Sequence, residues 1–244
     1  MYSWKAIRIA CGVLLALPLI HLAILISTET LASLNASPEV WTAEVEAYAR
    51  ADREHSLPEK PIVVVGGRRV KLWTDLEGML APAPVLMRGL GDATVDDIIY
   101  HYSRLVGFYQ PSVLVYLPSH SEFHVRDNKM AEDLVAGIKQ LADLSDSLQH
   151  RSPIVIFTPV KTPLFPSDNS RIDAVTRALT QWAAAQSQVV ILDSNAVLAK
   201  SDGNADPKFF RNDGINLTQA GYMRLSLLLR DQLDTNVAFS AEQD

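Results

Sequence analysis

Two adjacent arginines follow a short apolar run that should form a buried strand. Residues 60–76 read KPIVVVGGRRVKLWTDL, in which Ile62–Val65 is followed by two glycines and then by Arg68 and Arg69. A guanidinium stays protonated in proteins, so Arg68 cannot act as a nucleophile. It could bind an anion such as a carboxylate, a phosphate or a sulfated sugar, or it could pair with a carboxylate of the protein. We expect Arg69 to be solvated.

A serine and histidine cluster in SHSEFH, residues 119–124, offers a second source of chemistry. His120 could act as a general base toward Ser119 or Ser121, with Glu122 or Asp213 orienting its ring. Adjacent residues of an extended chain point to opposite sides, however. We therefore do not expect His120 and Ser121 to meet productively.

The same segment could hold a metal ion instead. His120, Glu122 and His124 alternate along the chain, which would place two imidazoles and a carboxylate on one side of an extended segment. Nothing elsewhere in the sequence requires a metal, so we predict neither a metal nor another cofactor. His101 lies within a predicted helix, and we expect it to be structural.

The elements that must position these residues alternate along the chain. Short runs rich in Val and Ile are typical of strands buried on both faces, and the segments between them have helical spacing of apolar residues. This alternation predicts an α/β fold with a parallel five-stranded sheet and helices on both faces. The strands are expected at Ile62–Val65, Val85–Met87, Val113–Leu117, Ile154–Phe157 and Val189–Leu192, and the helices at Pro38–His55, Val95–Phe108, Lys129–Ser147, Arg171–Gln186 and Thr218–Leu233.

Composition narrows the class of protein. The 244 residues carry a net charge of -6 and are 48% hydrophobic, which suits one globular domain of ordinary size. The mildly acidic composition does not indicate a basic surface of the kind that binds nucleic acid. A lone cysteine, Cys11, excludes an intrachain disulfide.

The first thirty residues have a different composition. Ile9–Ile26 carries no formal charge, and eighteen residues of helix rise about 27 Å, close to the thickness of a bilayer's hydrocarbon core. Lys5 and Arg8 precede the run, which places the N-terminus in the cytoplasm and the rest on the periplasmic or extracellular side. We favour a retained single-pass anchor in the cytoplasmic membrane. A cleaved signal peptide, with a site near Thr30–Ser33, stays open.

These observations divide the chain into four parts. We expect a membrane anchor or signal segment over residues 1–32, a helical lead-in and linker over 33–60, the α/β domain over 61–236, and a loose tail over 237–244.

Several blocks of the chain, in one order, resemble the SGNH/GDSL hydrolase superfamily, especially its bacterial branch similar to platelet-activating-factor acetylhydrolase. The resemblance covers about Trp41 to Leu233 and implies a flavodoxin-like fold of three layers. Its blocks are IVVVGGRRVKLW, PVLMRGLGDATVDDIIYHYSRLVGFYQPSVLVYL, PSHSEF and FFRNDGINLTQAGY.

The resemblance also implies what the chain has lost. The family transfers acyl groups with a serine, a histidine and an aspartate, and it stabilises the oxyanion with a glycine amide and an asparagine. The serine falls on Arg68, the glycine on Asp92, the asparagine on Ser121 and the histidine on Asn216, and only the aspartate is kept, as Asp213. Scaffold positions match the family: Trp73, Arg88, Gly89, Gly214, Gly221 and Tyr222.

The sequence therefore favours a membrane-anchored SGNH-fold protein that is catalytically inactive. It would bind a cell-envelope glycan or protein partner through Arg68, Asp92, Ser119–Ser121 and Asp213. Two alternatives remain open: an active acyl esterase or carbohydrate O-deacetylase with a non-standard site, and a structural subunit of a membrane complex. We further expect Arg68 and Asp92 to lie within about 4 Å of each other, and Asp213 could share the contact.

Overall fold

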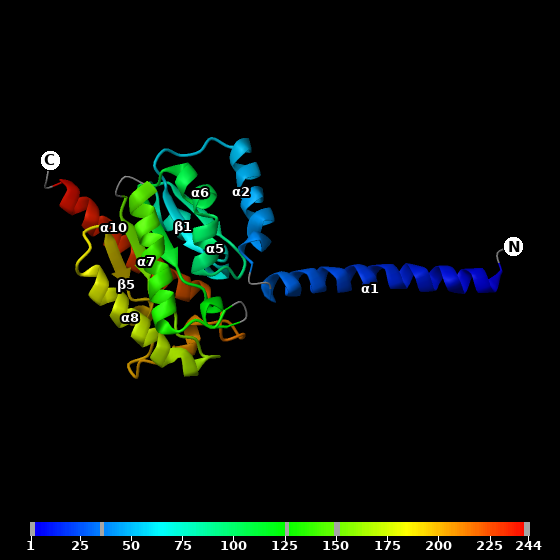
Figure 1. Ribbon diagram of the computed structural model, residues 1–244. Coiled ribbons are helices and arrows are strands. Elements are labelled where there is room, and N and C mark those ends of the chain that lie inside the picture. The colour runs from blue at the N-terminus through cyan, green and yellow to red at the C-terminus, as the bar shows by residue number, and fades with distance from the viewer. Residues whose placement is uncertain (1–2, 35–36, 125–126, 149–151, 242–244) are drawn as a thin grey trace. The chain divides into compact units, whose positions relative to one another are not determined.

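A computed structural model describes residues 3–34, 37–124, 127–148 and 152–241 of the chain (Figure 1). It divides into two compact units, Met1–Ala36 and Ser37–Asp244.

The first unit is one long helix. Helix α1 runs over Trp4–Leu34 and contains Pro18. Within the described residues, no helix has the apolar length that a bilayer crossing requires, so the transmembrane helix predicted over Ile9–Ile26 is not found there. The large apolar side chains described on α1 are exposed: Val13, Leu14, Leu15, Leu17, Leu19, Ile20, Leu22 and Ile24.

The second unit is built on a five-stranded parallel sheet in the order β2-β1-β3-β4-β5. The predicted strands are confirmed, two of them with an extension at their carboxyl ends. Apolar residues occupy both faces of the central strands, as a sheet covered on both sides requires. The strands are β1 Ile62–Gly66, β2 Val85–Gly89, β3 Val113–Leu117, β4 Ile154–Phe157 and β5 Val189–Leu192.

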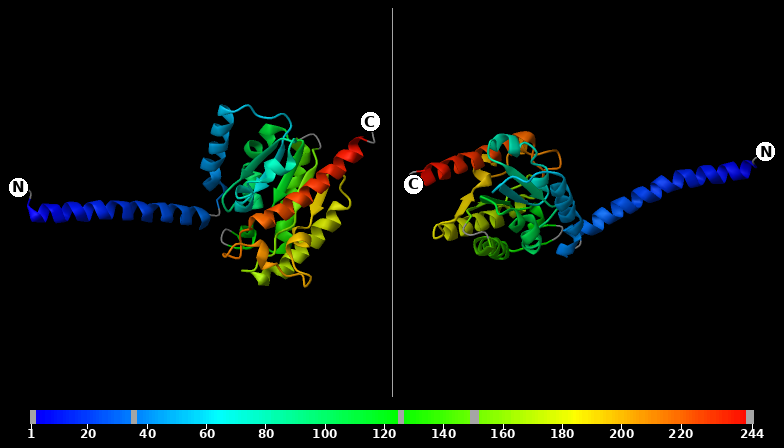
Figure 2. Two further views of the ribbon diagram at one scale, coloured as in Figure 1. Left: turned by 180° about the vertical axis from the view of Figure 1, so that it is seen from behind. Right: turned by 90° about the horizontal axis from the view of Figure 1, so that it is seen from above.

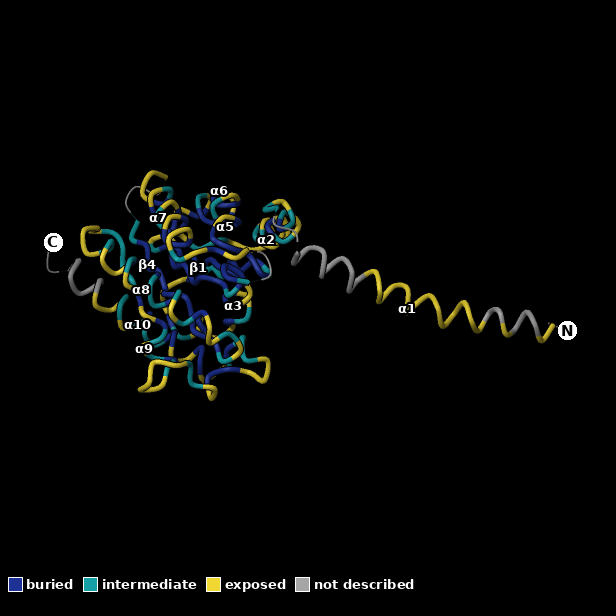
Figure 3. The backbone as a smooth tube through the Cα atoms, turned by 60° about the horizontal axis from the view of Figure 1, so that its bottom comes forward, coloured by how far each residue is buried: buried dark blue, intermediate teal, exposed yellow. Residues whose placement is uncertain are grey.

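Helices cover both faces of this sheet, and each face has its own apolar core (Figures 1 and 2). In β1, Val63 and Val65 point to one core, whereas Ile62 and Val64 point to the other. Both cores keep β1 and β4 buried (Figure 3). The first core takes in α2 Thr42–Glu54, α5 Val95–Tyr100, α6 Tyr102–Leu105, α7 Ala131–Leu148 and α8 Asn169–Ala183; the second takes in α3 Arg68–Lys71, α4 Leu76–Leu80, α9 Ser194–Leu198 and α10 Gln219–Ala241.

Three predicted helices differ from the observed ones. The helix expected over Pro38–His55 begins as the 3-10 turn η1 Pro38–Trp41, and α2 starts only at Thr42. The helix expected over Val95–Phe108 is divided into α5, α6 and a 3-10 turn, η2 Gly107–Tyr109. His101 stands at the first break, where it is buried and its Nε2 lies 2.8 Å from the Pro38 carbonyl oxygen, so its structural role is confirmed. Helix α10 continues past the predicted end at Leu233, because no proline or glycine follows to stop it. The predicted loose tail is thus helical as far as Ala241, and residues 242–244 lie outside the described residues.

The remaining short turns connect these elements at loops. They are the 3-10 segments η1 Pro38–Trp41, η3 His120–Glu122, η4 Pro166–Asp168 and η5 Pro207–Phe209. Of these, η3 follows β3 directly and therefore carries the predicted serine and histidine cluster to the edge of the sheet.

A buried tryptophan ties the α3 segment to the last helix. Trp73 donates a hydrogen bond from Nε1 to the Ser226 hydroxyl of α10 at 2.9 Å. Its ring stacks on Tyr222 with the centroids 5.9 Å apart and meets Phe157 edge-on at 5.8 Å. The turn after β1 is therefore held between the sheet and α10.

Gly66 should be the position of the fold that tolerates a side chain least. Its φ is +152°, and an added Cβ would lie 2.3 Å from the Leu117 carbonyl oxygen. We expect Gly66→Ala to lower the free energy of unfolding by about 3 kcal/mol, as strain and overpacking add. Urea denaturation of the full chain measures it. The matched control is Gly78→Ala at an exposed position of α4, where an added Cβ meets nothing within 4 Å. A loss there equal to that at Gly66 would contradict this reasoning.

Candidate functional site

Three loops leave the same edge of the sheet together. In the strand register, Gly66 at the end of β1 lies opposite both Gly89 of β2 and Leu117 of β3. The turn bearing the two arginines, the loop bearing Asp92 and the segment η3 therefore start side by side. Ligands of open α/β sheets bind at this carboxyl edge.

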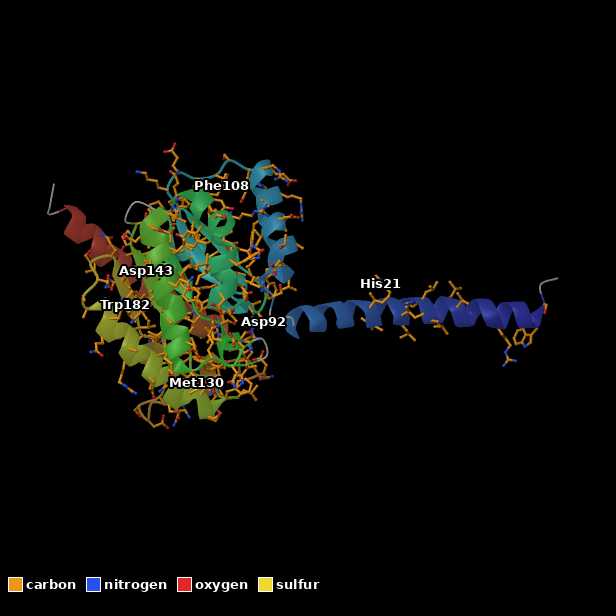
Figure 4. The ribbon with its side chains drawn as sticks, in the orientation of Figure 1. His21, Asp92, Phe108, Met130, Asp143 and Trp182 are labelled. Carbon is orange, nitrogen blue, oxygen red and sulfur yellow. The ribbon has the colours of Figure 1, made fainter. Side chains whose placement is uncertain are left out.

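Arg68 and Asp92 form a forked ion pair. Arg68 Nε donates to Asp92 Oδ1 at 2.9 Å, and Arg68 Nη2 donates to Oδ2 at 2.8 Å. The predicted contact between the two residues is confirmed; Figure 4 labels Asp92. The arginine side chain is 49% exposed and the aspartate side chain only 12%. The guanidinium thus covers a nearly buried carboxylate while its outer face meets solvent.

Arg69 contradicts the prediction that it is solvated, since the residue is only 3% exposed. Successive residues of an α-helix point about 100° apart, so the one-turn helix α3 directs Arg68 outward and Arg69 into the domain. Its Nη2 donates to the Ile215 carbonyl oxygen at 3.1 Å. Burial lowers the pKa of the Arg69 guanidinium to about 10. Sequence reasoning missed this residue, and the only available signal was helical spacing within a short turn.

His120, rather than Ser121, joins the ion pair electrostatically. Burial, followed by the charge of Arg69, lowers the pKa of His120 to about 4, while the charge of Asp92 acts in the opposite direction. Ser121 is fully buried, and its backbone N–H donates to the Ser119 hydroxyl at 3.2 Å. In the described part of the chain no hydrogen bond joins His120 to either serine. The side chain close enough to feel the charges of the pair is thus one position before that on which the resemblance placed an oxyanion group.

Glu122 turns away from this edge and into the core. Its carboxylate accepts hydrogen bonds from the Val95 backbone N–H at 2.6 Å, the Tyr116 hydroxyl at 3.0 Å and the Lys129 ammonium at 3.0 Å. These contacts consume its oxygens and fasten η3 to the start of α5. Glu122 therefore cannot join the two histidines around a metal ion.

His124 has a partner of its own. Its Nε2 contacts the Asp168 carboxylate, and its ring stacks on Phe165 with the centroids 3.9 Å apart. Among the residues that the structure describes, no group of three His, Cys, Asp or Glu side chains could hold a metal ion.

The loop after η5 brings Asp213 and Asn216 into contact. Asp213 accepts hydrogen bonds from the backbone N–H of Ile215 at 2.8 Å, and from the backbone N–H and side-chain amide of Asn216 at 2.9 Å and 2.7 Å. Partial burial opposes ionisation of Asp213, but these hydrogen bonds outweigh it and lower its pKa. Gly214 allows the turn with a φ of +65°. Asn216 thus contacts Asp213 from the position three residues after it, where the resemblance implies a histidine.

Comparison with solved structures identifies the fold. A structure of a platelet activating factor from Streptococcus pneumonia superposes with a TM-score of 0.70 at 15% identity, over 88% of this chain and 99% of that one. A GDSL-like lipase from Bacteroides thetaiotaomicron gives a TM-score of 0.64 at 15% identity, over 80% and 98% of the two chains. The fold is that of the SGNH/GDSL hydrolases.

A third SGNH-fold neighbour acts on carbohydrate by its description. The carbohydrate esterase family 3 protein from Talaromyces cellulolyticus superposes with a TM-score of 0.58 at 14% identity, over 72% of this chain and 98% of that one. No family model matches the sequence, and no curated protein matches it. The likeness therefore establishes the SGNH fold, and the chemistry must be argued from the side chains.

Removing Arg68 and removing Asp92 should lower the free energy of unfolding by unequal amounts. Arg68→Met leaves a nearly buried carboxylate without its partner, and we expect a loss of about 2 kcal/mol in unfolding free energy. Asp92→Asn leaves a half-exposed guanidinium that can turn to water, so we expect a loss of about 1 kcal/mol or less. Chemical denaturation of both single variants and the double variant gives the coupling.

A more exposed ion pair, between Lys71 of α3 and Glu44 of α2, serves as the control. Lys71→Met removes the contact of Lys71 with Glu44, whose side chains are 50% and 33% exposed, and should change stability by no more than about 0.5 kcal/mol. Equal losses for Arg68→Met and Lys71→Met would show that Arg68 does not shield a buried charge.

Glu122 should make stability fall between acid and neutral pH. Burial raises the pKa of Glu122 to about 7, although the Lys129 ammonium opposes this shift. The folded chain holds this proton up to about pH 7, whereas the unfolded chain releases it near 4.5, the ordinary value. The stability contributed by the proton is therefore complete below about pH 4.5 and is lost as the pH rises to about 7. Subtracting the unfolding free energy of Glu122→Gln from that of the native chain should give this slope; parallel curves would exclude it.

Proposed function

We propose that this SGNH-fold chain has lost acyl transfer and works by binding. The observation that carries the proposal is the forked bond between Arg68 and Asp92 at the edge of the sheet. By the resemblance, these positions belong to the nucleophile and to an oxyanion donor. The pair replaces both with charges that neutralise each other.

Each chemical step of ester hydrolysis lacks a group at this edge. Arg68 supplies no nucleophile, because its guanidinium is only a hydrogen-bond donor. Asp92 would repel the oxyanion that forms in acyl transfer. The Asn216 amide is no general base near neutral pH. His120 has a pKa of about 4, and no hydrogen bond connects it with a serine in the described part.

The ligand that we propose is a cell-envelope glycan or a protein partner of the envelope. The half-exposed face of Arg68 and the exposed loop at Asp213 form a polar surface at the carboxyl edge of the sheet. A hydrolase-like fold that kept such a surface could still recognise a carbohydrate or an acylated partner. The carbohydrate esterase among the structural neighbours supports the glycan as the first ligand to test.

Location is a separate part of the proposal. We propose that α1 anchors the chain in the cytoplasmic membrane with the second unit outside the cytoplasm. The support is the uncharged run of the sequence over residues 9–26 and the exposed leucines and isoleucines described on α1. Carbonate extraction of membranes and protease accessibility in spheroplasts test the two halves of this statement.

A second candidate is an active ester hydrolase with an unorthodox site. The contact between His124 and Asp168 is the observation in its favour, because a carboxylate can orient a histidine as a general base. Ser119 lies close enough to border the same small cavity as both residues. This arrangement would place the base on a different loop from that of the family.

The activity test separates the two candidates. We expect the native full chain in detergent to hydrolyse p-nitrophenyl acetate no faster than the Ser119→Ala variant in the same buffer, because the chain lacks an activated nucleophile. Release of p-nitrophenolate is the measurement. Turnover that disappears in both Ser119→Ala and His124→Ala would establish the esterase and overturn the binding proposal.

A separate experiment measures the proposed binding of a glycan. The immobilised full chain should retain polysaccharide isolated from the cell envelope of a strain that expresses this protein. Replacing both Arg68 and Asp92 by alanine should lower the affinity for this polysaccharide at least about tenfold. Arg177→Ala on exposed α8 is the matched control, since it alters charge away from this edge. Equal retention by all three proteins would show that the Arg68 surface takes no part.

A further inference from the structure

A groove between α2 and α6 lies away from the candidate site. It measures about 670 Å³, a size that suits a small-molecule ligand. Leu57 on its wall comes shortly before β1 and Phe108 shortly before β3, so the groove lies at the amino edge of the sheet. The candidate site lies at the carboxyl edge, and Figure 4 accordingly labels Phe108 and Asp92 apart from each other. The α2–α6 groove is therefore a separate surface of the second unit.

Arginines from both helices line the α2–α6 groove. Arg50 and Arg53 are three residues apart on α2, which places them on one face of that helix, and Arg104 comes from α6. All three residues are exposed. The groove thus carries guanidinium groups on two walls, although the chain as a whole has a net charge of -6.

Asp52 borders the groove but does not neutralise these arginines. Its Oδ1 accepts a hydrogen bond from Arg88 Nη2 at 2.7 Å, and its Oδ2 accepts one from the Tyr109 hydroxyl. The Arg88 guanidinium lies over the rings of Tyr48 and Tyr109, with its Cζ 4.9 Å and 4.7 Å from their centroids. The charge of Asp52 is therefore compensated by Arg88 within a part-buried cluster beside the groove.

Glu46, another carboxylate on the groove, is a weak partner. Its Oε2 lies 4.0 Å from Arg50 Nη1, at the limit of an ion pair, and the two side chains are 54% and 58% exposed. An exposed pair of this kind contributes little. Within the described residues, neither Arg53 nor Arg104 forms an ion pair with a carboxylate. The α2–α6 groove is therefore positively charged.

The same groove also offers an apolar surface. The Phe108 ring is 67% exposed, and it meets the Tyr109 ring edge-on with the centroids 5.2 Å apart. Ala49 and Leu57 add aliphatic groups to the lining. A ligand that covered Phe108 would gain free energy by removing apolar surface from water. The groove thus suits a ligand that has both an anionic group and an apolar part.

We propose that the α2–α6 groove binds a phosphate ester that carries an apolar group. Arginine forms charge-assisted hydrogen bonds with phosphate oxygens, and a phosphate supplies the negative charge that Arg53 and Arg104 lack within the protein. The apolar group would lie against Phe108. Two sources share this chemistry: the headgroup region of an anionic phospholipid and a soluble aryl phosphate. The proposal does not involve Arg68 or Asp92, so it is independent of the proposed function.

Three small probes test whether both parts of the ligand matter. In titration calorimetry of the full chain in uncharged detergent, phenyl phosphate should bind at least about tenfold more tightly than inorganic phosphate or phenyl glucoside. Inorganic phosphate has the charge alone, and phenyl glucoside has the ring alone. Equal affinities for phenyl phosphate and either of the other two, or no binding of phenyl phosphate, would overturn the proposal.

Variants of exposed residues locate the binding. Replacing both Arg53 and Arg104 by alanine should lower the affinity for phenyl phosphate at least about tenfold, whereas Arg177→Ala on α8 should leave it unchanged. Phe108→Ser should weaken the binding of phenyl phosphate and leave that of inorganic phosphate unchanged. All four positions are exposed, so these variants should keep the fold. The same affinity in the double variant as in the native chain would exclude the groove.

Dihexanoyl phosphatidic acid distinguishes the two sources. If it displaces phenyl phosphate and binds more tightly, the natural ligand is the headgroup region of a phospholipid. If it displaces phenyl phosphate but binds more weakly, the ligand is a soluble aryl phosphate. If the double variant binds both compounds as the native chain does, neither occupies the groove and the proposal is wrong.

Discussion

The central strand β1 fixes what every other part of the second unit can do. It pairs with β2 on one side and β3 on the other, and apolar side chains bury both of its faces. At its end, Gly66 approaches the β3 backbone so closely that a Cβ would overlap the Leu117 carbonyl oxygen at 2.3 Å. The chain must therefore turn at once, and α3 starts at Arg68. That turn sets the directions of two neighbouring side chains: Arg68 points to the open edge, and Arg69 points inward.

The opposite fates of these side chains follow from charge. Toward the edge, Asp92 is available, and a forked bond spreads the charge of Arg68 over two hydrogen bonds to the carboxylate. Inward, the loop of Ile215 offers only a carbonyl oxygen to Arg69. A carbonyl dipole compensates a full charge poorly in a medium of low dielectric constant. Within the described residues, the same residue type thus forms an ion pair at one position, whereas at the next it is buried with a hydrogen bond to a carbonyl oxygen.

The sequence predicted the layers of this fold well and the site less completely. Continuous Val and Ile runs fix the strands, because a doubly covered parallel sheet accepts little else. The contact of Arg68 with Asp92 followed from the family resemblance, which places the two opposite charges at positions that face the same substrate atom. The burial of Arg69 did not follow, because its partner Ile215 is 146 residues away and only tertiary packing brings that loop over α3. Likewise, η3 is a 3-10 turn in which Ser121 and Glu122 are buried, and an interpretation based on an extended chain cannot show this.

The ion pair also bears on how such a site can arise. An aspartate at position 92 beside a neutral residue at 68 would lose the guanidinium that neutralises its charge, whereas the two residues together form a neutral pair in which the aspartate side chain is 12% exposed. The two charges are therefore energetically coupled, and each makes the other tolerable. Around them, Gly66, Trp73 and Tyr222 hold the turn in close packing. The close packing of the turn is thus intact around a matched pair of charges at the carboxyl edge of the sheet.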